Sequence, residues 1–197
     1  YGFWPTAGYT WLRAGKGSVY EGGVRVPAFA YWPGMIEPGQ KSMDIVHISD
    51  LYTTAAVLAG AEEFVPRDRV IDGVDQSALL LLGPGHSHRN YVIHYSGSNL
   101  KAIRHGDIKM VFTNEDFGGY KKPEFFNIAR DPAEKMPSFY RQLNQLEPFM
   151  QIVQAHHLRK NRFPDRDPVR RIPMGYDHLS HLFAPTQREG HHYHEEL

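Results

Sequence analysis

The stretch RAGKGSVYEGGVRVPAFAYWPG, residues 13–34, decides how the chain is interpreted. Its first half is rich in glycine and holds Lys16 between two glycines, whereas its second half alternates and ends in Pro-Gly. Glycine lets a backbone turn sharply or approach another group closely, and a lysine placed there is available to a small anion as a point charge. The second half is typical of a strand that runs into a turn. The stretch therefore predicts a loop that can bind an anion, followed by an interior strand over residues 24–32.

Lys16 alone does not identify an anion site, because an ordinary lysine on a surface loop would give the same short motif. The nucleotide-binding pattern G-x-x-x-x-G-K-[ST] is not met, since no glycine stands at position 10 or 11. Glu21 and Arg25 are four residues apart and could pair with each other or hold the loop. Gly22 and Gly23 are expected to serve close packing or a positive φ angle rather than ligand contact.

The composition allows a buried core and excludes several kinds of site. Of 197 residues, 41% are hydrophobic and 13% aromatic, and 22 basic residues balance 22 acidic ones. No overall charge points to nucleic acid or to a membrane surface, and no apolar run reaches transmembrane length. Without cysteine the chain has no disulfide, thiolate metal site or cysteine nucleophile. It begins without Met or a signal-like segment, so we expect a piece of a longer protein.

Helical and β-rich segments follow one another in a fixed order. Apolar spacing predicts a helix over residues 50–59, with Asp50 as a possible cap and Gly60 as the stop. A helical period over residues 137–160 contains Pro148, which either kinks one helix or separates two. Between them lie a loop with a short helical turn and several β-rich runs: RNYVIHYSG, LKAIRHGDIKMVFT with a hairpin turn at RHGD, and a short strand in PEFFNIARDP.

This order predicts an α/β protein in three parts. Residues 1–88 would be the end of a larger α/β domain, and residues 89–160 a small antiparallel sheet with a packed helix. Residues 161–197, rich in proline and histidine, would be an irregular extension. His156, His157 and the histidines of HHYHEEL could bind a metal, although solvated histidines are expected in such a segment.

Five blocks in order over residues 13–137 resemble the sulfatase family. The opening stretch is similar to the second sulfatase signature, and HISDLYTTAAVLAG resembles the family's D-x-x-P-T-x-x-x-x-A-G helix without its proline. IDGVDQSALLLLG resembles DG-x-x-x-x-P-L-L-x-G, with Ala78 where proline is usual. LKAIRHGDIKMVF resembles the x-x-A-V-R-x-G-x-x-K hairpin, and FFNIARDPAEKMP resembles L-[YF]-[DN]-L-x-x-D-P-x-E. The last 40 or so residues resemble no known block.

The resemblance implies the alkaline phosphatase superfamily fold, with a large α/β domain and a small C-terminal domain built on a four-stranded antiparallel sheet. It implies a sulfuric ester hydrolase whose nucleophile is a formylglycine made within C/S-x-P-x-R. It also implies calcium held by Asp and Asn oxygens, which suit a hard cation. This chain contains neither C/S-x-P-x-R nor an Asp-Asn pair shortly before Lys16. Nucleophile and calcium ligands are therefore expected upstream of Tyr1, in an N-terminal catalytic region that would be the partner of this chain.

By the same resemblance, Lys16 binds the sulfate and stabilises the negative charge that grows on its oxygens as the S–O bond breaks. His94, Lys101 and Asn114 are candidate substrate-binding residues. His94, near the end of a predicted strand, could face the cleft or have a structural partner. Lys101 and Arg104 should lie on opposite faces of one strand; Lys101 is the candidate for an acidic sugar or second sulfate, and Arg104 is expected to be structural. Asn114 falls where relatives send a loop over the site, although a solvated loop would look the same.

The substrate implied by the resemblance is a sulfated carbohydrate or an aryl sulfate, and the implied location is extracytoplasmic: periplasmic, secreted or lysosomal. Two other functions remain open. One is a phosphate or phosphonate monoester hydrolase of the same superfamily. The other is a non-catalytic pseudoenzyme that binds an anion or a carbohydrate.

Overall fold

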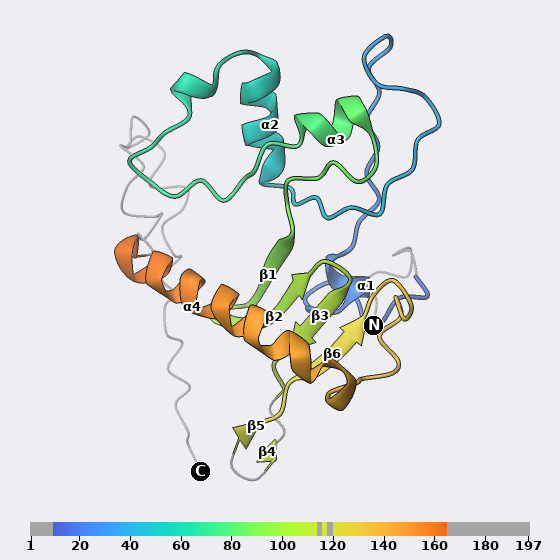
Figure 1. Ribbon diagram of the computed structural model, residues 1–197, viewed down its shortest axis with the longest axis vertical. Coiled ribbons are helices and arrows are strands. Elements are labelled where there is room, and N and C mark those ends of the chain that lie inside the picture. Colours follow the sequence, from blue (N-terminus) through green and yellow to red (C-terminus); the bar gives the residue numbers. More distant parts are fainter. Residues whose placement is uncertain (1–9, 114–115, 118–119, 165–197) are drawn as a thin grey trace, which may run out of the picture.

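The computed structural model describes residues 10–113, 116–117 and 120–164, and its centre is a four-stranded antiparallel sheet (Figure 1). The strand order is β1-β2-β3-β6, and two short strands, β4 and β5, pair separately. The strands are β1 Tyr91–Ser96, β2 Asn99–His105, β3 Ile108–Val111, β4 Asp116–Phe117, β5 Tyr120–Lys121 and β6 Glu124–Asn127. The predicted fold class, α/β with a small antiparallel sheet and a helix beside it, is confirmed. The predicted domain boundaries stay a prediction.

The hairpin between β2 and β3 has the two-residue turn that its sequence predicts. His105 pairs with Ile108, and Gly106 between them has a φ angle of 55°. Two-residue hairpin turns require such a left-handed angle at their first central position, and glycine adopts it without strain.

One face of the sheet packs against helix α4, Leu146–Arg162, which runs across it (Figure 1). Ile103, Met110 and Phe125 form a buried cluster with Phe149 of the helix. Pro148 lies in the first turn of α4, where the backbone N–H groups have no partner within the helix. A 3₁₀ helix, Tyr140–Gln145, precedes α4. Of the two alternatives for this segment, the structure therefore has two helices rather than one kinked helix.

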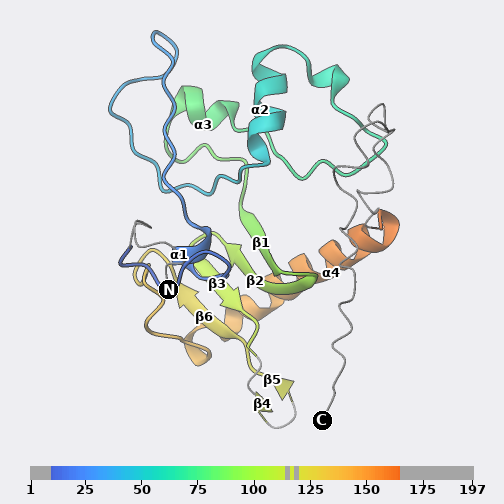
Figure 2. The same cartoon turned by 180° about the vertical axis from the view of Figure 1, so that it is seen from behind.

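The other face of the sheet packs against residues 13–25, which include the short helix α1, Glu21–Val24. Val19 and Tyr20 contact a buried cluster whose members come from β2, β3, β6 and the residue after β6: Ala102, Val111, Phe126 and Ile128. Seen from behind, α1 lies in front of the sheet, on the side opposite α4 (Figure 2). The sheet is thus a two-sided platform, and the loop that carries Lys16 rests on one side of it.

Helices α2, Asp50–Leu58, and α3, Ser77–Leu82, lie apart from the sheet with the 3₁₀ helix Glu62–Phe64 (Figure 1). Helix α2 ends as predicted: Gly60, with a φ angle of 64°, donates to Val57 O at 2.9 Å, and Ala61 N donates to Ala56 O at 2.8 Å. These two bonds form a Schellman motif, for which glycine is the usual residue. The N-cap, however, is Ser49 rather than Asp50.

The predicted interior strand over residues 24–32 is wrong. Helix α1 ends at Val24, and the residues that follow are in no strand and are exposed to solvent; Phe29 is 97% and Tyr31 84% exposed. A strand needs a neighbour for its backbone N–H and C=O groups, and none of the described strands lies beside this segment.

Within the described part of the chain, no helix is long and apolar enough to cross a bilayer.

Candidate functional site

Lys16 stands at the corner of a tight turn formed by residues 15–18. Ser18 N donates to Gly15 O at 3.1 Å, and Gly17, the third residue of the turn, has a φ angle of 92°. A left-handed angle at this position is the requirement of a type II turn, so the second glycine of GKG fixes the turn. The Lys16 side chain is exposed at the corner.

Gly22 and Gly23 allow this turn to fold back onto α1. Gly22 N donates to Arg13 O at 2.9 Å, and a Cβ on Gly22 would lie 2.4 Å from the carbonyl oxygens of Arg13 and Ala14. A Cβ on Gly23 would lie 2.6 Å from Gly15 O and 2.4 Å from the carbonyl oxygen of Ser18. Side chains never come so close, so both glycines serve close backbone packing, as the sequence predicts.

Glu21 anchors α1 to the sheet through two buried residues, Lys109 on β3 and Glu134 in the loop after β6. Lys109 Nζ lies 3.0 Å from Glu21 Oε1 and 2.9 Å from Glu134 Oε1. The backbone N–H of Glu21 donates to Glu134 Oε2 at 2.6 Å. Lys109 and Glu134 are fully buried, and Glu21 is 1% exposed. We call these three residues the Glu21–Lys109–Glu134 cluster.

Three arginines surround the cluster. Arg104 Nη1 lies 3.7 Å and Arg25 Nη1 4.0 Å from Glu21 Oε2. Arg13 donates through Nη1 to Glu134 O at 2.9 Å, and its guanidinium lies over the Tyr20 ring, 3.9 Å from the centroid. The loop is therefore braced, as expected, and Arg25 is the more distant of the braces.

Reasoning from the sequence gave Lys109 and Glu134 no role, although they are the lysine and the glutamate that end two of the sulfatase-like blocks. The available signal was a lysine inside the apolar run IKMV on a short strand, since a buried lysine needs a charged partner. Burial raises the pKa of the Glu134 carboxyl, and the Glu21 N–H and the charge of Lys109 oppose that rise.

His94 of β1 lies near this cluster. It pairs with Ala102, so strand alternation places it on the sheet face that carries Lys109 and Arg104. Its Nε2 is buried and has no hydrogen-bond partner among the described residues. Burial, followed by the positive charge of Lys109, lowers the pKa of His94 to about 4. The imidazole is therefore neutral near pH 7, and the substrate-binding role of His94 stays a prediction.

The structure places Lys101 and Arg104 on opposite faces of β2. Arg104 reaches Glu21 and donates through Nε to Gly106 O at 3.1 Å, which fits the structural role expected of it. By alternation Lys101 lies on the opposite face, the side of α4, as its spacing from Arg104 predicts. Asn114 lies outside the described residues. The substrate-binding roles of Lys101 and Asn114 stay predictions.

The described residues contain no cluster of carboxylate and histidine side chains suited to a metal ion. Among residues 10–113, 116–117 and 120–164, no group of three or more His, Asp or Glu side chains could hold a metal ion. They therefore do not fit the calcium that the resemblance implies, and no chemical step is derived through it. His156, in α4, bonds instead through Nε2 to the hydroxyl of Tyr95.

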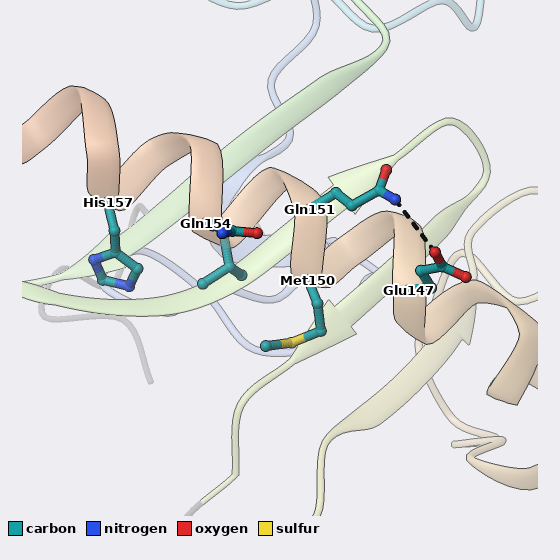
Figure 3. A pocket seen from close by; sticks show the side chains of 6 residues that line it. Glu147, Met150, Gln151, Gln154 and His157 are labelled. Carbon is teal, nitrogen blue, oxygen red and sulfur yellow. Dashed lines mark hydrogen bonds between the residues drawn. The ribbon is translucent and has the colours of Figure 1, made fainter.

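A hollow of about 640 Å³ lies on the exposed side of α4 and has no part in the site (Figure 3). Its lining comes from this one helix and includes Glu147, Met150, Gln154 and His157. Within it Gln151 donates to Glu147 Oε1 at 3.4 Å. The helix lies on the sheet face opposite the Lys16 loop, so this hollow cannot share a ligand with Lys16.

Comparison with known proteins identifies relatives of this chain. Rat steryl-sulfatase is 37% identical over 64% of this chain, and mouse N-acetylgalactosamine-6-sulfatase is 33% identical over 72% of it. The chain spans about 26% and 32% of the length of these relatives. The crystal structure of PsFucS1 sulfatase from Pseudoalteromonas sp. matches 84% of this chain and 36% of its own, with a TM-score of 0.76 and 32% identity. No protein-family model matches the chain. The predicted resemblance is confirmed: the chain belongs to the sulfatase family, and the matches are consistent with a C-terminal portion of a sulfatase.

Proposed function

We propose that this chain is part of an enzyme that hydrolyses sulfate monoesters, and that Lys16 binds the sulfate group. The observation that carries the proposal is the placement of Lys16, an exposed cation on a turn that is closed on α1 and anchored by buried charges. The sulfatase relatives support ester hydrolysis as the reaction class.

The role of Lys16 is electrostatic. As the S–O bond breaks, negative charge grows on the leaving and peripheral oxygens, and an ammonium carried by a fixed turn stabilises that charge. An ordinary surface lysine has to give up side-chain freedom and solvent contacts first. A fixed turn removes the backbone part of that cost.

For the substrate we propose a sulfated carbohydrate or an aryl sulfate. The relatives named steryl-sulfatase and N-acetylgalactosamine-6-sulfatase differ in the alcohol part of their names, yet each is more than 30% identical to this chain. The group common to both names is the sulfate, which fits a proposal centred on a sulfate-binding lysine. We also propose an extracytoplasmic location, as the family resemblance implies.

The partner that we propose is an N-terminal catalytic region of the same protein, which would supply the formylglycine nucleophile and the calcium ligands. Two observations support it. The chain spans about a third or less of the relatives' length. The segment after α1 also exposes apolar side chains that a packed region would cover, including Val26, Phe29 and Tyr31 at 77%, 97% and 84% exposure.

The test is Lys16→Ala in the full-length protein, assayed on paired aryl sulfate and aryl phosphate esters. We expect kcat/KM for the sulfate ester to fall on the order of 10²- to 10³-fold. Lys41→Ala, a change at another exposed loop lysine, is the control and should leave it unchanged.

Each rival function has its own outcome. A wild-type protein that prefers the phosphate ester would indicate the phosphatase alternative, and one that turns over neither ester would indicate the pseudoenzyme. A Lys16→Ala enzyme with near-normal kcat/KM would show that Lys16 does not bind the sulfate.

A further inference from the structure

We infer that Glu21, Lys109 and Glu134 are positioning residues, which set the direction of Lys16 by fixing its turn to the antiparallel sheet. The inference rests on the proposed role of Lys16. It gives the small sheet a part in the reaction, since β3 supplies the buried cation that holds the loop.

The path from Lys16 to the sheet consists of direct contacts. The turn of residues 15–18 packs its backbone on Gly23, and Gly22 N bonds to Arg13 O. These glycines belong to the same helical turn as Glu21, whose carboxylate meets Lys109 on β3. A shift of the Glu21 carboxylate would therefore move the backbone on which the Lys16 turn rests.

Helix α1 cannot hold this position by itself. It has four residues, and a single helical turn is far too short to be stable alone. Its position is fixed from outside, by the ion pair from Lys109 to its first side chain and by the bond from its first N–H to Glu134 Oε2.

Glu134 occupies a backbone conformation that favours glycine. Its φ angle is 52°, in the left-handed region where few residues other than glycine are found. Glycine would be the residue of least strain here but has no carboxylate. A glutamate at this position is explained if its carboxylate is needed, and in the structure that carboxylate contacts Lys109 and the Glu21 N–H.

Stability alone is a poor explanation of the cluster. Burying three charged groups carries a large desolvation penalty, and apolar replacements of similar volume are often as stable or more stable. Ion pairs and hydrogen bonds instead fix the orientation of the groups that they join, whereas apolar contacts depend little on orientation.

The cluster also keeps carboxylates away from Lys16. Both acidic groups are held by Lys109, and Glu21 further faces Arg104. Among the described residues the exposed Lys16 has no ion-pair or hydrogen-bond partner, so its charge remains available to a ligand.

A double-mutant cycle on the full-length protein tests the inference. Glu21→Gln keeps the shape of the side chain and removes its charge, and it is made both in the wild type and with Lys16→Ala. If Glu21 acts through Lys16, Glu21→Gln lowers kcat/KM for the aryl sulfate on the order of 10²-fold in the wild type, the cost of a misplacement of about 1 Å. In the Lys16→Ala background it should cost no more than about twofold, because there is no ammonium left to misplace.

Ile103→Val is the control for a purely structural effect. Ile103 is buried on the opposite face of the sheet, so this change should lower the melting temperature and act equally in both backgrounds. Equal losses from Glu21→Gln in both backgrounds, or no loss in either, would overturn the inference. If Glu21→Gln does not fold, Glu21→Asp, which keeps the charge but shortens its reach, decides by the same comparison. Lys16→Ala without loss would instead refute the proposed sulfate-binding role of Lys16, so the two failures are distinguishable.

Discussion

Asp50 and Arg89, 39 positions apart in the sequence, form a bidentate ion pair. Arg89 Nε lies 2.9 Å from Asp50 Oδ2, and its Nη2 lies 2.5 Å from Oδ1. The Asp50 carboxylate also accepts the backbone N–H groups of His47 and Val74 at 2.8 and 3.0 Å. Burial alone would raise the pKa of Asp50, but the Arg89 hydrogen bonds and these N–H groups outweigh it and hold the pKa below its usual range. The pair joins the start of α2 to the segment that leads into β1.

Arg89→Ala is expected to destabilise the protein by about 3–5 kcal/mol, because it leaves the Asp50 carboxylate buried without its counter-ion. Chemical denaturation at pH 7 measures the loss. Arg69, whose pair with Asp68 is exposed, is the matched control, and Arg69→Ala should have little effect. Similar losses in the two variants would contradict a special role of the buried pair.

Gly22→Ala is expected to open the Lys16 loop, since the new Cβ would lie 2.4 Å from two backbone carbonyl oxygens that cannot rotate away. In the full-length protein the variant should lose most of the kcat/KM that Lys16→Ala loses. Gly15→Ala is the control, because a Cβ on Gly15 meets nothing within 4 Å. A tolerated Gly22→Ala together with a damaging Gly15→Ala would reverse the assignment of the two glycines.

His94 should make the protein less stable as the pH falls. Its pKa is about 4 in the folded chain, against about 6.5 when unfolded, so between these values the unfolded state binds one more proton. Stability is therefore retained above pH 6.5 and lost as the pH falls towards 4, by about 3 kcal/mol for this group. Urea denaturation at several pH values in this window should give a flatter dependence for His94→Gln than for the wild type. Equal slopes would show that the buried imidazole titrates normally.

The exposed apolar segment after α1 should stabilise the full-length protein. Phe29→Ser and Tyr31→Ser are expected to make residues 1–197 alone more soluble but to lower the melting temperature of the full-length protein, whose additional region would cover both rings. Phe64→Ser is the control, at a side chain that is 76% exposed on the 3₁₀ helix before α3. Unchanged melting of the full-length Phe29 and Tyr31 variants would argue against a packed partner region there.

Residues 1–197 alone are expected to hydrolyse no sulfate ester and to bind calcium weakly or not at all. The chain has no cysteine and no S-x-P-x-R, and its described residues hold no metal-binding group of three. Turnover of an aryl sulfate and calorimetric calcium titration of the purified chain measure this. Activity in that preparation would place the nucleophile within this chain and reject our assignment of it to another region.

Local sequence signals predicted local structure well. The turn at Gly106, the stop at Gly60 and the start of α4 just before Pro148 each depend on the backbone limits of one residue, which act wherever the chain lies. The prediction of a strand over residues 24–32 was wrong because the apolar pattern indicates a segment that is buried against other parts of a protein. The described residues provide no such neighbours for it. Lys109 and Glu134 were missed for a similar reason. Lys109 and Glu21 are 88 positions apart, and no local pattern records such a pairing.

Because the Glu21–Lys109–Glu134 cluster joins the Lys16 turn to the sheet, the local stability of the sheet should depend on whether the turn has bound an anion. Binding and stability are linked reciprocally. An anion that stabilises the Lys16 turn therefore also stabilises the sheet to which the cluster joins that turn. The amide hydrogens of β3 would then exchange with solvent more slowly when sulfate is bound than when the turn is empty. In Glu21→Gln the sheet should still fold, but the amide exchange of β3 should no longer slow when sulfate binds.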